Sequence, residues 1–345
     1  MEIHRQFETI SAGSRPAAVV KSADMAASEQ RVHSLPGPFP AARFRLRFQA
    51  EQPYSIRGYR GSAWRGVFGP ALKKLVCITS DGECAPCLVR SSCAFPYIFE
   101  TAPAPEDDAP ASVGQAPHPY VLAPEPEWRP RTVRGETVEV TLLGHGVREW
   151  PYVLHALRRG AGRGLGVERV PLRLVSAEQQ DPASGRWSTI LRGDGVLIGL
   201  PAATPEPPAM PARFRLRLLT PLRVRREDDL VEPERLGFDE FVATLLRRLA
   251  LLSRFHTGSA WRFDHAGLRE LAARAAIVEQ RLSWQDWARY STRQQRRIPM
   301  GGVVGHSVVE AGGLEPLWPM LWLGQWTHLG KGAVMGLGRY SLEGL

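Results

Sequence analysis

With 345 residues, of which 43% are hydrophobic, the chain is long enough for two domains and apolar enough to bury a core in each, which excludes a wholly disordered protein. No apolar run approaches the roughly 18 residues that a membrane-spanning helix needs. The formal net charge is +9. We therefore expect a soluble, cytoplasmic protein without a membrane partner.

Arginine carries nearly all of the positive charge. Only four of the 44 Lys and Arg residues are lysines, which leaves 40 arginines. The planar guanidinium group binds phosphate with two parallel hydrogen bonds and stacks on bases, so the composition favours a nucleic-acid partner. A GC-rich genome is the alternative source of the bias.

The N-terminal residues 1–40 mix Ala, Ser, Pro and charged residues without a sustained hydrophobic period. They predict a mobile extension.

The first ordered element begins with "ARFRLRF" at Ala42, where apolar and basic residues alternate strictly. This period of two is typical of a strand with one buried face. Apolar residues then recur at three- and four-residue steps over 64–75, which predicts an amphipathic helix.

All four cysteines follow this helix within 17 residues, with the spacing C-x6-C-x2-C-x5-C. A C-x2-C pair is suited to hold one metal ion, and two further thiolates complete a closed tetrahedral zinc site. A cytoplasmic protein is not expected to form two disulfides here. The spacing therefore predicts a structural zinc; four ordinary thiols are the alternative. The predicted ligands are Cys77, Cys84, Cys87 and Cys93.

The same order of elements occurs a second time. "ARFRLRL" begins at Ala212, and a clear amphipathic helix pattern covers 238–252. A "GLG" triplet occurs at Gly164 and again at Gly336, so two landmarks recur at nearly the same offset. This repetition predicts a tandem of two related α+β units. The alternative is that "RFRLR" is an ordinary edge strand in an arginine-rich chain.

Proline-rich stretches mark the expected domain boundaries. The predicted first unit covers 41–200 with an insertion at about 77–130. A linker is expected at 201–211, and the second unit covers 212–345.

The segment "HLGKGAVMGLGRY" at 328–340 is the most distinctive motif. It lacks the G-x-x-x-x-G-K-[ST] pattern of a P-loop because Lys331 is followed by Gly332, and too little chain remains after Gly338 for a dinucleotide-binding unit. Two interpretations stay open: a loop whose backbone N–H groups bind an anion, or a tight turn that lets backbones approach closely.

This glycine-rich segment resembles the signature of the CRISPR-associated (Cas) RAMP superfamily. The closest resemblance is to the endoribonucleases of the sixth Cas protein family, which process precursor CRISPR RNA. Further segments agree in order: "RGSAWRGVFGPALKKLVC", "CAPCLVRSSCAFPYIFE", "RRGAGRGLGVERVPLRL", "FDEFVATLLRRLALLSRFHTG" and "WARYSTRQQRRIPMGGVVGHSVVEA". Together they cover about residues 42–345.

The resemblance implies an α+β fold of tandem ferredoxin-like (RRM-type) βαββαβ units with the cysteine-bearing insertion in the first. It also implies that the glycine-rich loop and an arginine-bearing hairpin hold the stem-loop of a CRISPR repeat RNA, a mode that suits recognition of duplex RNA by shape and phosphate contacts. The RNA-binding residues expected from these two segments are Arg293, Arg296, Arg297, Gly330, Lys331, Gly332, Gly336, Gly338 and Arg339.

For the chemistry, the resemblance implies attack by the RNA's own 2′-OH without a metal ion, which leaves a 2′,3′-cyclic phosphate. Family members place His, Tyr and Lys around the first strand and helix, but this chain has no His between Leu46 and Leu75. The catalytic candidates are therefore His256, His328 and Tyr290. Each has a structural alternative: a helix C-terminal histidine, a loop brace and a packed aromatic ring.

Two other functions remain open. A catalytically silent RNA-binding subunit of a CRISPR complex needs only the arginines and glycines, and the missing histidine favours it. A zinc-containing structural protein needs no RNA at all. The partners expected on the first two interpretations are repeat RNA, mature guide RNA and other subunits of a Cas effector complex.

Overall fold

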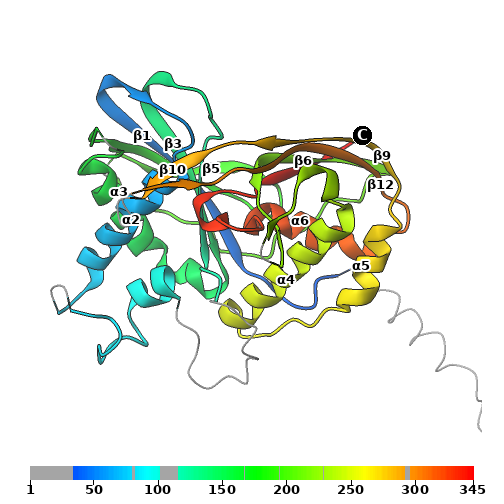
Figure 1. The fold of residues 1–345 in the computed structure, drawn as a ribbon. Helices are drawn as coiled ribbons and strands as arrows, with labels where there is room; N and C mark the ends of the chain where they lie inside the picture. The colour runs from blue at the N-terminus through cyan, green and yellow to red at the C-terminus, as the bar shows by residue number, and fades with distance from the viewer. Residues whose placement is uncertain are drawn as a thin grey trace, which may run out of the picture.

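The computed structural model describes residues 34–79, 82–101, 116–166, 168–193, 195–227, 229–291 and 296–345. In these ranges the chain forms two units, each built from one antiparallel sheet with helices packed on one face (Figure 1). Among the helices described there, none has the length and apolar character that a membrane crossing requires.

The first unit has the strand order of a ferredoxin-like sheet. Its sheet runs β2-β3-β1-β4-β5 with every neighbouring pair antiparallel, so the first four strands follow the order expected for βαββαβ and β5 is added at one edge. The elements are β1 (Ala41–Ile56), α2 (Gly61–Val76), β2 (Tyr120–Pro124), β3 (Arg131–Leu143), α3 (Trp150–Gly162), β4 (Arg173–Gln180) and β5 (Trp187–Arg192).

The second unit repeats this topology. Its sheet runs β13-β6-β12-β9, again antiparallel throughout, which confirms the predicted tandem of ferredoxin-like units. Its main elements are β6 (Arg213–Leu222), α4 (Phe238–His256), α5 (His265–Ala273), β9 (Ile277–Gln285), β12 (Gly302–Glu310), α6 (Trp318–Thr327) and β13 (Tyr340–Gly344). Two small hairpins are added: β7 (Arg225–Arg226) with β8 (Asp229–Leu230), and β10 (Ala288–Ser291) with β11 (Arg296–Pro299).

The alternating strands fold as their pattern predicts. Phe44, Leu46 and Phe48 of β1 are buried in the core of the first unit, while the arginines between them lie on the opposite face of the sheet. Phe214 and Leu216 of β6 repeat the arrangement in the second core. Burying one face of each sheet under its helices removes these side chains from water, which is the main force that fixes the strand register.

Two predicted boundaries were wrong. The insertion expected at about 77–130 includes β2, an edge strand of the first sheet whose residues are all buried. The extension expected at 1–40 ends in packed chain, because Phe39 is fully buried against Trp261 and its N–H donates to Thr204 Oγ1. Residues 1–33 lie outside the described ranges. Local composition did not reveal the pairing of β2 in the sheet or the packing of Phe39 on Trp261. In both cases the contacting residues are distant in sequence.

The glycine-rich segment lies at the junction of the two units. A 3-10 turn, Ala333–Met335, is flanked by Gly332 and Gly336, whose φ angles are +86° and +84°. A Cβ atom added at Gly336 would lie 2.1 Å from Tyr59 Oη and 2.8 Å from the Leu122 carbonyl oxygen, both in the first unit. Only glycine combines this backbone conformation with so close an approach.

We predict that Gly336→Ala destabilises the protein by about 2–4 kcal/mol, because the new methyl group meets the first unit and the left-handed backbone is strained with a Cβ. The measurement is the free energy of unfolding in urea. Gly312→Ala is the matched control, since an added Cβ there has no heavy atom within 4 Å and should change stability by less than about 0.5 kcal/mol. Equal effects of the two substitutions would contradict the packing role of Gly336.

Candidate nucleic-acid interface

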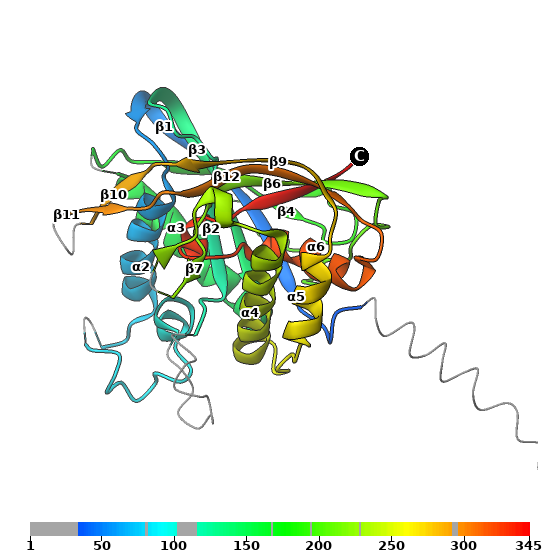
Figure 2. The same cartoon turned by 45° about the vertical axis from the view of Figure 1, so that its right-hand side comes forward.

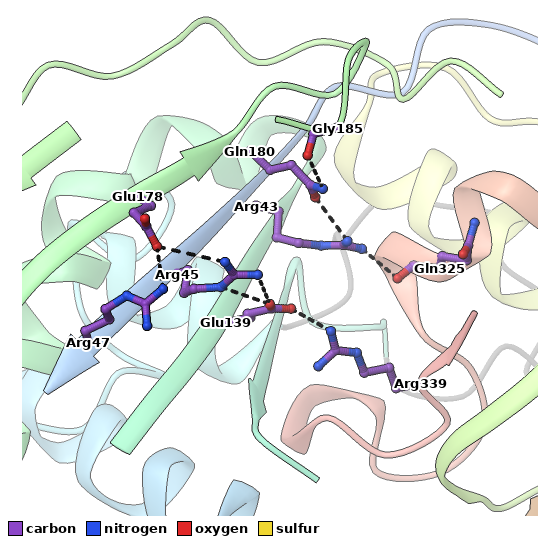
Figure 3. Close-up of polar contacts among 9 residues, drawn as sticks. All are labelled: Arg43, Arg45, Arg47, Glu139, Glu178, Gln180, Gly185, Gln325 and Arg339. Carbon is purple, nitrogen blue, oxygen red and sulfur yellow. Dashed lines mark hydrogen bonds and ion pairs between the residues drawn. The ribbon is translucent and has the colours of Figure 1, made fainter. Parts of the chain in front are cut away.

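A network of arginines and two glutamates lies on the face of the first sheet opposite its helices, and one of these carboxylates joins the two units (Figure 3). Glu139 on β3 accepts hydrogen bonds from Arg45 of β1, at 3.0 Å from Nη2, and from Arg339 of the second unit, at 2.8 Å. Burial alone would raise the pKa of the Glu139 carboxyl. The nearby guanidinium groups, led by Arg339 and Arg43, outweigh burial and hold that pKa below its usual value.

Arg43 crosses the same junction. Its Nη2 donates to the carbonyl oxygen of Gln325 on α6 at 2.7 Å, its Nη1 donates to Gln180 of β4, and its guanidinium lies 4.3 Å from the centre of the Trp326 ring. Burial lowers the pKa of Arg43 to about 10, which leaves it charged at neutral pH. The predicted RNA ligand Arg339 and this arginine are therefore both engaged within the protein.

The glycine-rich segment divides into two parts with different surroundings. Gly336 and Gly338 are buried, and the carbonyl oxygen of Gly336 accepts from Thr220 Oγ1 at 2.8 Å. Lys331 is exposed between Gly330 and Gly332, which are only partly buried. The two interpretations of the sequence thus apply to different glycines. The inner pair, Gly336 and Gly338, allows close packing, whereas the outer pair, Gly330 and Gly332, is accessible to a ligand.

Lys331 belongs to a group of cations that the sequence did not place together. Its backbone N–H donates to the carbonyl oxygen of Arg223 at 2.9 Å. Partial desolvation and the positive charges of Arg225 and Arg223 lower the pKa of the Lys331 ammonium group. Both of the charged side chains that lower this pKa are cations, so an incoming anion would relieve their repulsion with Lys331. Arg223 and Arg225 lie just after β6 and carry no motif that sequence reasoning singled out.

The arginine-bearing hairpin β10–β11 projects from the long strands β9 and β12 toward the first unit (Figures 1 and 2). Its base is fixed by aromatic rings, because Trp287 lies edge-on to Tyr59 with ring centres 5.5 Å apart, and Trp128 stacks on Tyr59 at 5.0 Å. Arg223 reinforces this base by donating to the carbonyl oxygen of Gly301 at 3.0 Å.

The structure locates the predicted hairpin residues only in part. Tyr290 and Arg297 face each other across the β10–β11 ladder, and Arg296 pairs with Ser291. Their side chains, and the whole of Arg293, lie outside what the structure describes. Their roles in RNA binding and catalysis stay predictions.

His256 is placed as a link between the units and not at an open surface. It is 1% exposed at the C-terminal end of α4. Its Nε2 lies 2.6 Å from the carbonyl oxygen of Pro117 and its Nδ1 lies 3.2 Å from Tyr97 Oη. Burial lowers the pKa of this imidazole to about 4, so a neutral ring donates from Nε2 to the carbonyl and accepts the tyrosine hydroxyl at Nδ1. This position does not support the predicted catalytic role.

His328 is also buried, with 2% of its surface exposed. Its backbone φ is +52°, a value that residues other than glycine seldom adopt. Burial, followed by the positive charge of Arg339, lowers the pKa of this histidine well below its usual value. Its Nδ1 is a buried nitrogen without a hydrogen-bond partner among the described residues. The position fits the alternative of a loop brace and leaves the ring without access to a phosphate.

Tyr59 is a further residue of the junction whose position the sequence did not reveal. It is 4% exposed, and its hydroxyl has no hydrogen-bond partner within the described ranges. Burial raises the pKa of this phenol, which therefore stays protonated and can act as a hydrogen-bond donor. No short motif marks it, because its neighbours Trp128, Trp287 and Gly336 come from distant parts of the chain.

The four cysteines line one pocket beside the end of α2. No disulfide joins these four cysteines, and burial raises the pKa of Cys84. Among the residues described, however, no three His, Cys, Asp or Glu side chains form a group that could hold a metal ion. This arrangement of Cys77, Cys84, Cys87 and Cys93 does not by itself fit a closed zinc site, and zinc binding stays a prediction from their spacing.

Two antiparallel ferredoxin-like sheets joined through a glycine-rich segment define the fold class. Comparison with known proteins relates this fold to a family. Residues 216–340 match the family model of the CRISPR-associated endoribonuclease Cas6, and residues 39–201 match a model described as an N-terminal domain. Residues 216–340 therefore form a Cas6 domain, in agreement with the resemblance that the sequence showed. A search of curated proteins finds no match.

Solved structures agree in fold. The product complex of a Thermus thermophilus Cas6 is 17% identical, with a TM-score of 0.54 over 88% of this chain and 99% of that one. A partial Cas6-RT-Cas1–Cas2 complex is 13% identical, with a TM-score of 0.53 over 90% of this chain and 47% of the other. At such identities the likeness establishes the shared tandem fold.

The buried histidines predict how stability depends on pH. Because the pKa of His256 is about 4 when folded and about 6.5 when unfolded, the unfolded chain binds the extra proton between these values. Stability should therefore be complete above about pH 6.5 and fall as the pH drops toward 4, by about 3 kcal/mol for this residue. His256→Gln should reduce the slope of unfolding free energy against pH by about 1.4 kcal/mol per unit.

The measurement is urea unfolding at several pH values between 4 and 7. His155→Gln, on an exposed position of α3, is the matched control. An unchanged slope in His256→Gln would mean that this ring is not held neutral in the folded protein.

Proposed function

We propose that this protein binds the stem-loop of a CRISPR repeat RNA and cuts it to release mature guide RNA. The observation that carries the proposal is the group of Lys331, Arg223 and Arg225 at the exposed part of the glycine-rich segment. It lies beside the base of an arginine-bearing hairpin in a chain with a Cas6 domain. Clustered cations attract a phosphate backbone by releasing its counterions, without reading the base sequence.

The glycine-rich segment and the hairpin would hold the duplex from two sides. Arg296 and Arg297 begin β11 and would follow the RNA backbone. Lys331 would bind a phosphate beside Gly330. Recognition of an RNA duplex relies on shape, phosphates and 2′-hydroxyl groups because its deep groove is closed to side chains. Arginine-rich hairpins and exposed loop backbone suit that mode.

The proposed reaction is attack by a 2′-oxygen on the adjacent phosphorus, without a metal ion. A proton leaves the 2′-OH, the bond from phosphorus to the 5′-oxygen breaks, and that oxygen takes up a proton. The products are a 2′,3′-cyclic phosphate and a free 5′-OH. Tyr290 remains a proposed participant, and the phenol of Tyr59 offers a protonated donor at the same junction. Cations near the phosphate would stabilise the charge that develops there.

A catalytically silent RNA-binding subunit is the second candidate function. The observation that favours it is the burial of His256 and His328, which removes the two predicted histidines from any exposed phosphate. Binding needs only the cations and the glycine backbone. Solved structures with a similar fold include a Cas6 product complex and a partial Cas6-RT-Cas1–Cas2 complex. We propose that this chain likewise stays with its RNA and contacts other Cas subunits.

Cleavage in excess EDTA distinguishes the two functions. The purified chain is incubated with the repeat RNA of its own locus, and we expect one cut at the base of the stem-loop with a cyclic phosphate on the upstream fragment. Tight binding without a cut would establish the silent subunit. A cut that appears only when divalent cations are restored would contradict the metal-independent mechanism but not the nuclease.

Removing two cations tests the binding surface. Lys331→Ala with Arg225→Ala should weaken binding of the stem-loop and reduce the salt dependence of the affinity, since about two phosphate contacts are lost. Arg262→Ala, an exposed arginine on the second unit, is the control. Fluorescence anisotropy over a series of salt concentrations measures both quantities. Affinity and salt dependence like those of the control would remove the glycine-rich segment from the RNA site.

A further inference from the structure

The first unit carries a wide cleft that lies outside the glycine-rich junction. It opens where β1 separates from its neighbours, since the β1–β3 ladder jumps from the pair Gln49–Gly135 to the pair Tyr54–Val133. The pairing of β1 with β4 ends at the same place, with Gln49 opposite Arg173. The chain from 50 to 53 bulges outward there and forms one wall of the cleft.

The opposite wall is formed by residues 168–174. They follow the first unit's own glycine segment, which has the GLG triplet at Gly164 that recurs at Gly336. Leu165 and Val170 exchange two backbone hydrogen bonds and close a tight loop. Gly164 has a φ of +109°, and an added Cβ would lie 2.3 Å from the carbonyl oxygen of Arg169. Arg169 itself has a φ of +50°. Strained backbone of this kind persists where the surrounding structure enforces it, and it is concentrated at binding sites.

Arginines dominate the charge of the cleft. Its lining includes four arginines against two glutamates, with the amides of two glutamines between them. In the part of the chain that the structure describes, Arg134, Arg169 and Arg173 are exposed and make no ion pair. The floor is apolar, because Leu172 and Leu174 are buried beneath this rim. An excess of exposed guanidinium groups above an apolar floor suits a phosphate backbone.

The glycine segment beside the cleft and the second unit's glycine-rich segment both approach the first turn of α2. On one side, an added Cβ at Gly166 would lie 2.9 Å from the Arg60 side chain. Arg60 is the residue that precedes the first turn of α2, and its guanidinium pairs with Glu136 at 3.0 Å. On the other side, a Cβ at Gly61 would lie 1.9 Å from the carbonyl oxygen of Met335. The two glycine segments are therefore separated only by the N-terminal turn of one helix.

We propose that this cleft is a second RNA-binding site, which holds the sugar-phosphate backbone of the single-stranded RNA that flanks the stem-loop. The inference rests on the proposed RNA-binding function of the junction and extends it to the first unit. Tyr54 is the aromatic residue of the lining, and its hydroxyl is engaged with Glu136 at 2.7 Å. Contacts in the cleft are therefore made to phosphates and not to stacked bases, and the site reads no sequence.

The test compares two RNAs: the minimal repeat stem-loop, and the same stem-loop with single-stranded flanks. The variant Arg134→Gln/Arg169→Gln/Arg173→Gln removes three cleft cations. For the flanked RNA, the slope of log affinity against log salt should fall by about 2, which corresponds to a loss of tens of fold near 0.15 M salt. Binding of the minimal stem-loop should be unchanged. Anisotropy titrations on the full chain measure both.

Arg186→Gln/Arg247→Gln/Arg262→Gln is the control, because it removes the same charge from exposed positions away from the cleft. If the triple cleft variant does not fold, Arg134→Gln/Arg173→Gln leaves the strained position intact and should lower the slope by about 1.4. A cleft variant that behaves like the control on flanked RNA overturns the second site, while stem-loop binding still upholds the proposed function. Failure of the wild type to bind the stem-loop overturns both.

Discussion

The carboxylate of Glu139 is the interaction on which the arrangement of the two units depends. It lies on the open face of the first sheet and accepts hydrogen bonds from Arg45 of its own unit and Arg339 of the other. Loss of a partner from a largely buried ion pair costs about 3–5 kcal/mol, because the remaining charge stays desolvated. This ion pair therefore fixes the position of the start of β13 relative to the first sheet. It also fixes the position of the glycine-rich segment that precedes β13.

The glycine-rich segment combines close packing against the first unit with an exposed, positively charged loop. Its inner glycines let the second unit approach Tyr59 and the β2 backbone more closely than any side chain would allow. Its outer glycines leave Lys331 exposed beside Arg223 and Arg225, where like charges gather at a cost that an anion would offset. Rigid packing on one side thus supports an open, cationic loop on the other, which is how a binding loop keeps its shape without its ligand.

The groups suited to phosphate binding and the groups suited to proton transfer differ in their exposure to solvent. The exposed groups of the junction are cations and backbone, which suit phosphate binding. The groups able to move protons, His256, His328 and Tyr59, are buried, and their pKa values are shifted so that each stays neutral near pH 7. If the chain cuts RNA, its proton transfers depend on the hairpin, on groups of the RNA itself or on exposure of these side chains when RNA binds.

Local patterns in the sequence determined the fold to a large extent. The alternation in "ARFRLRF" indicated which face of β1 is buried, and the repeat of strand, helix and glycine segment indicated two related α+β units, because both are patterns along the chain. The ferredoxin-like topology of each unit was implied by the family resemblance. The edge strand β2 was missed, since a short buried strand within a proline-rich stretch has no period to detect. The sequence also placed Lys331 on an accessible loop. Only the tertiary structure brought Arg223 and Arg225 beside it, buried the two histidines and assigned Arg339 to Glu139. Those outcomes depend on contacts between residues that are distant in the sequence, such as Glu139 and Arg339, and no local pattern encodes them.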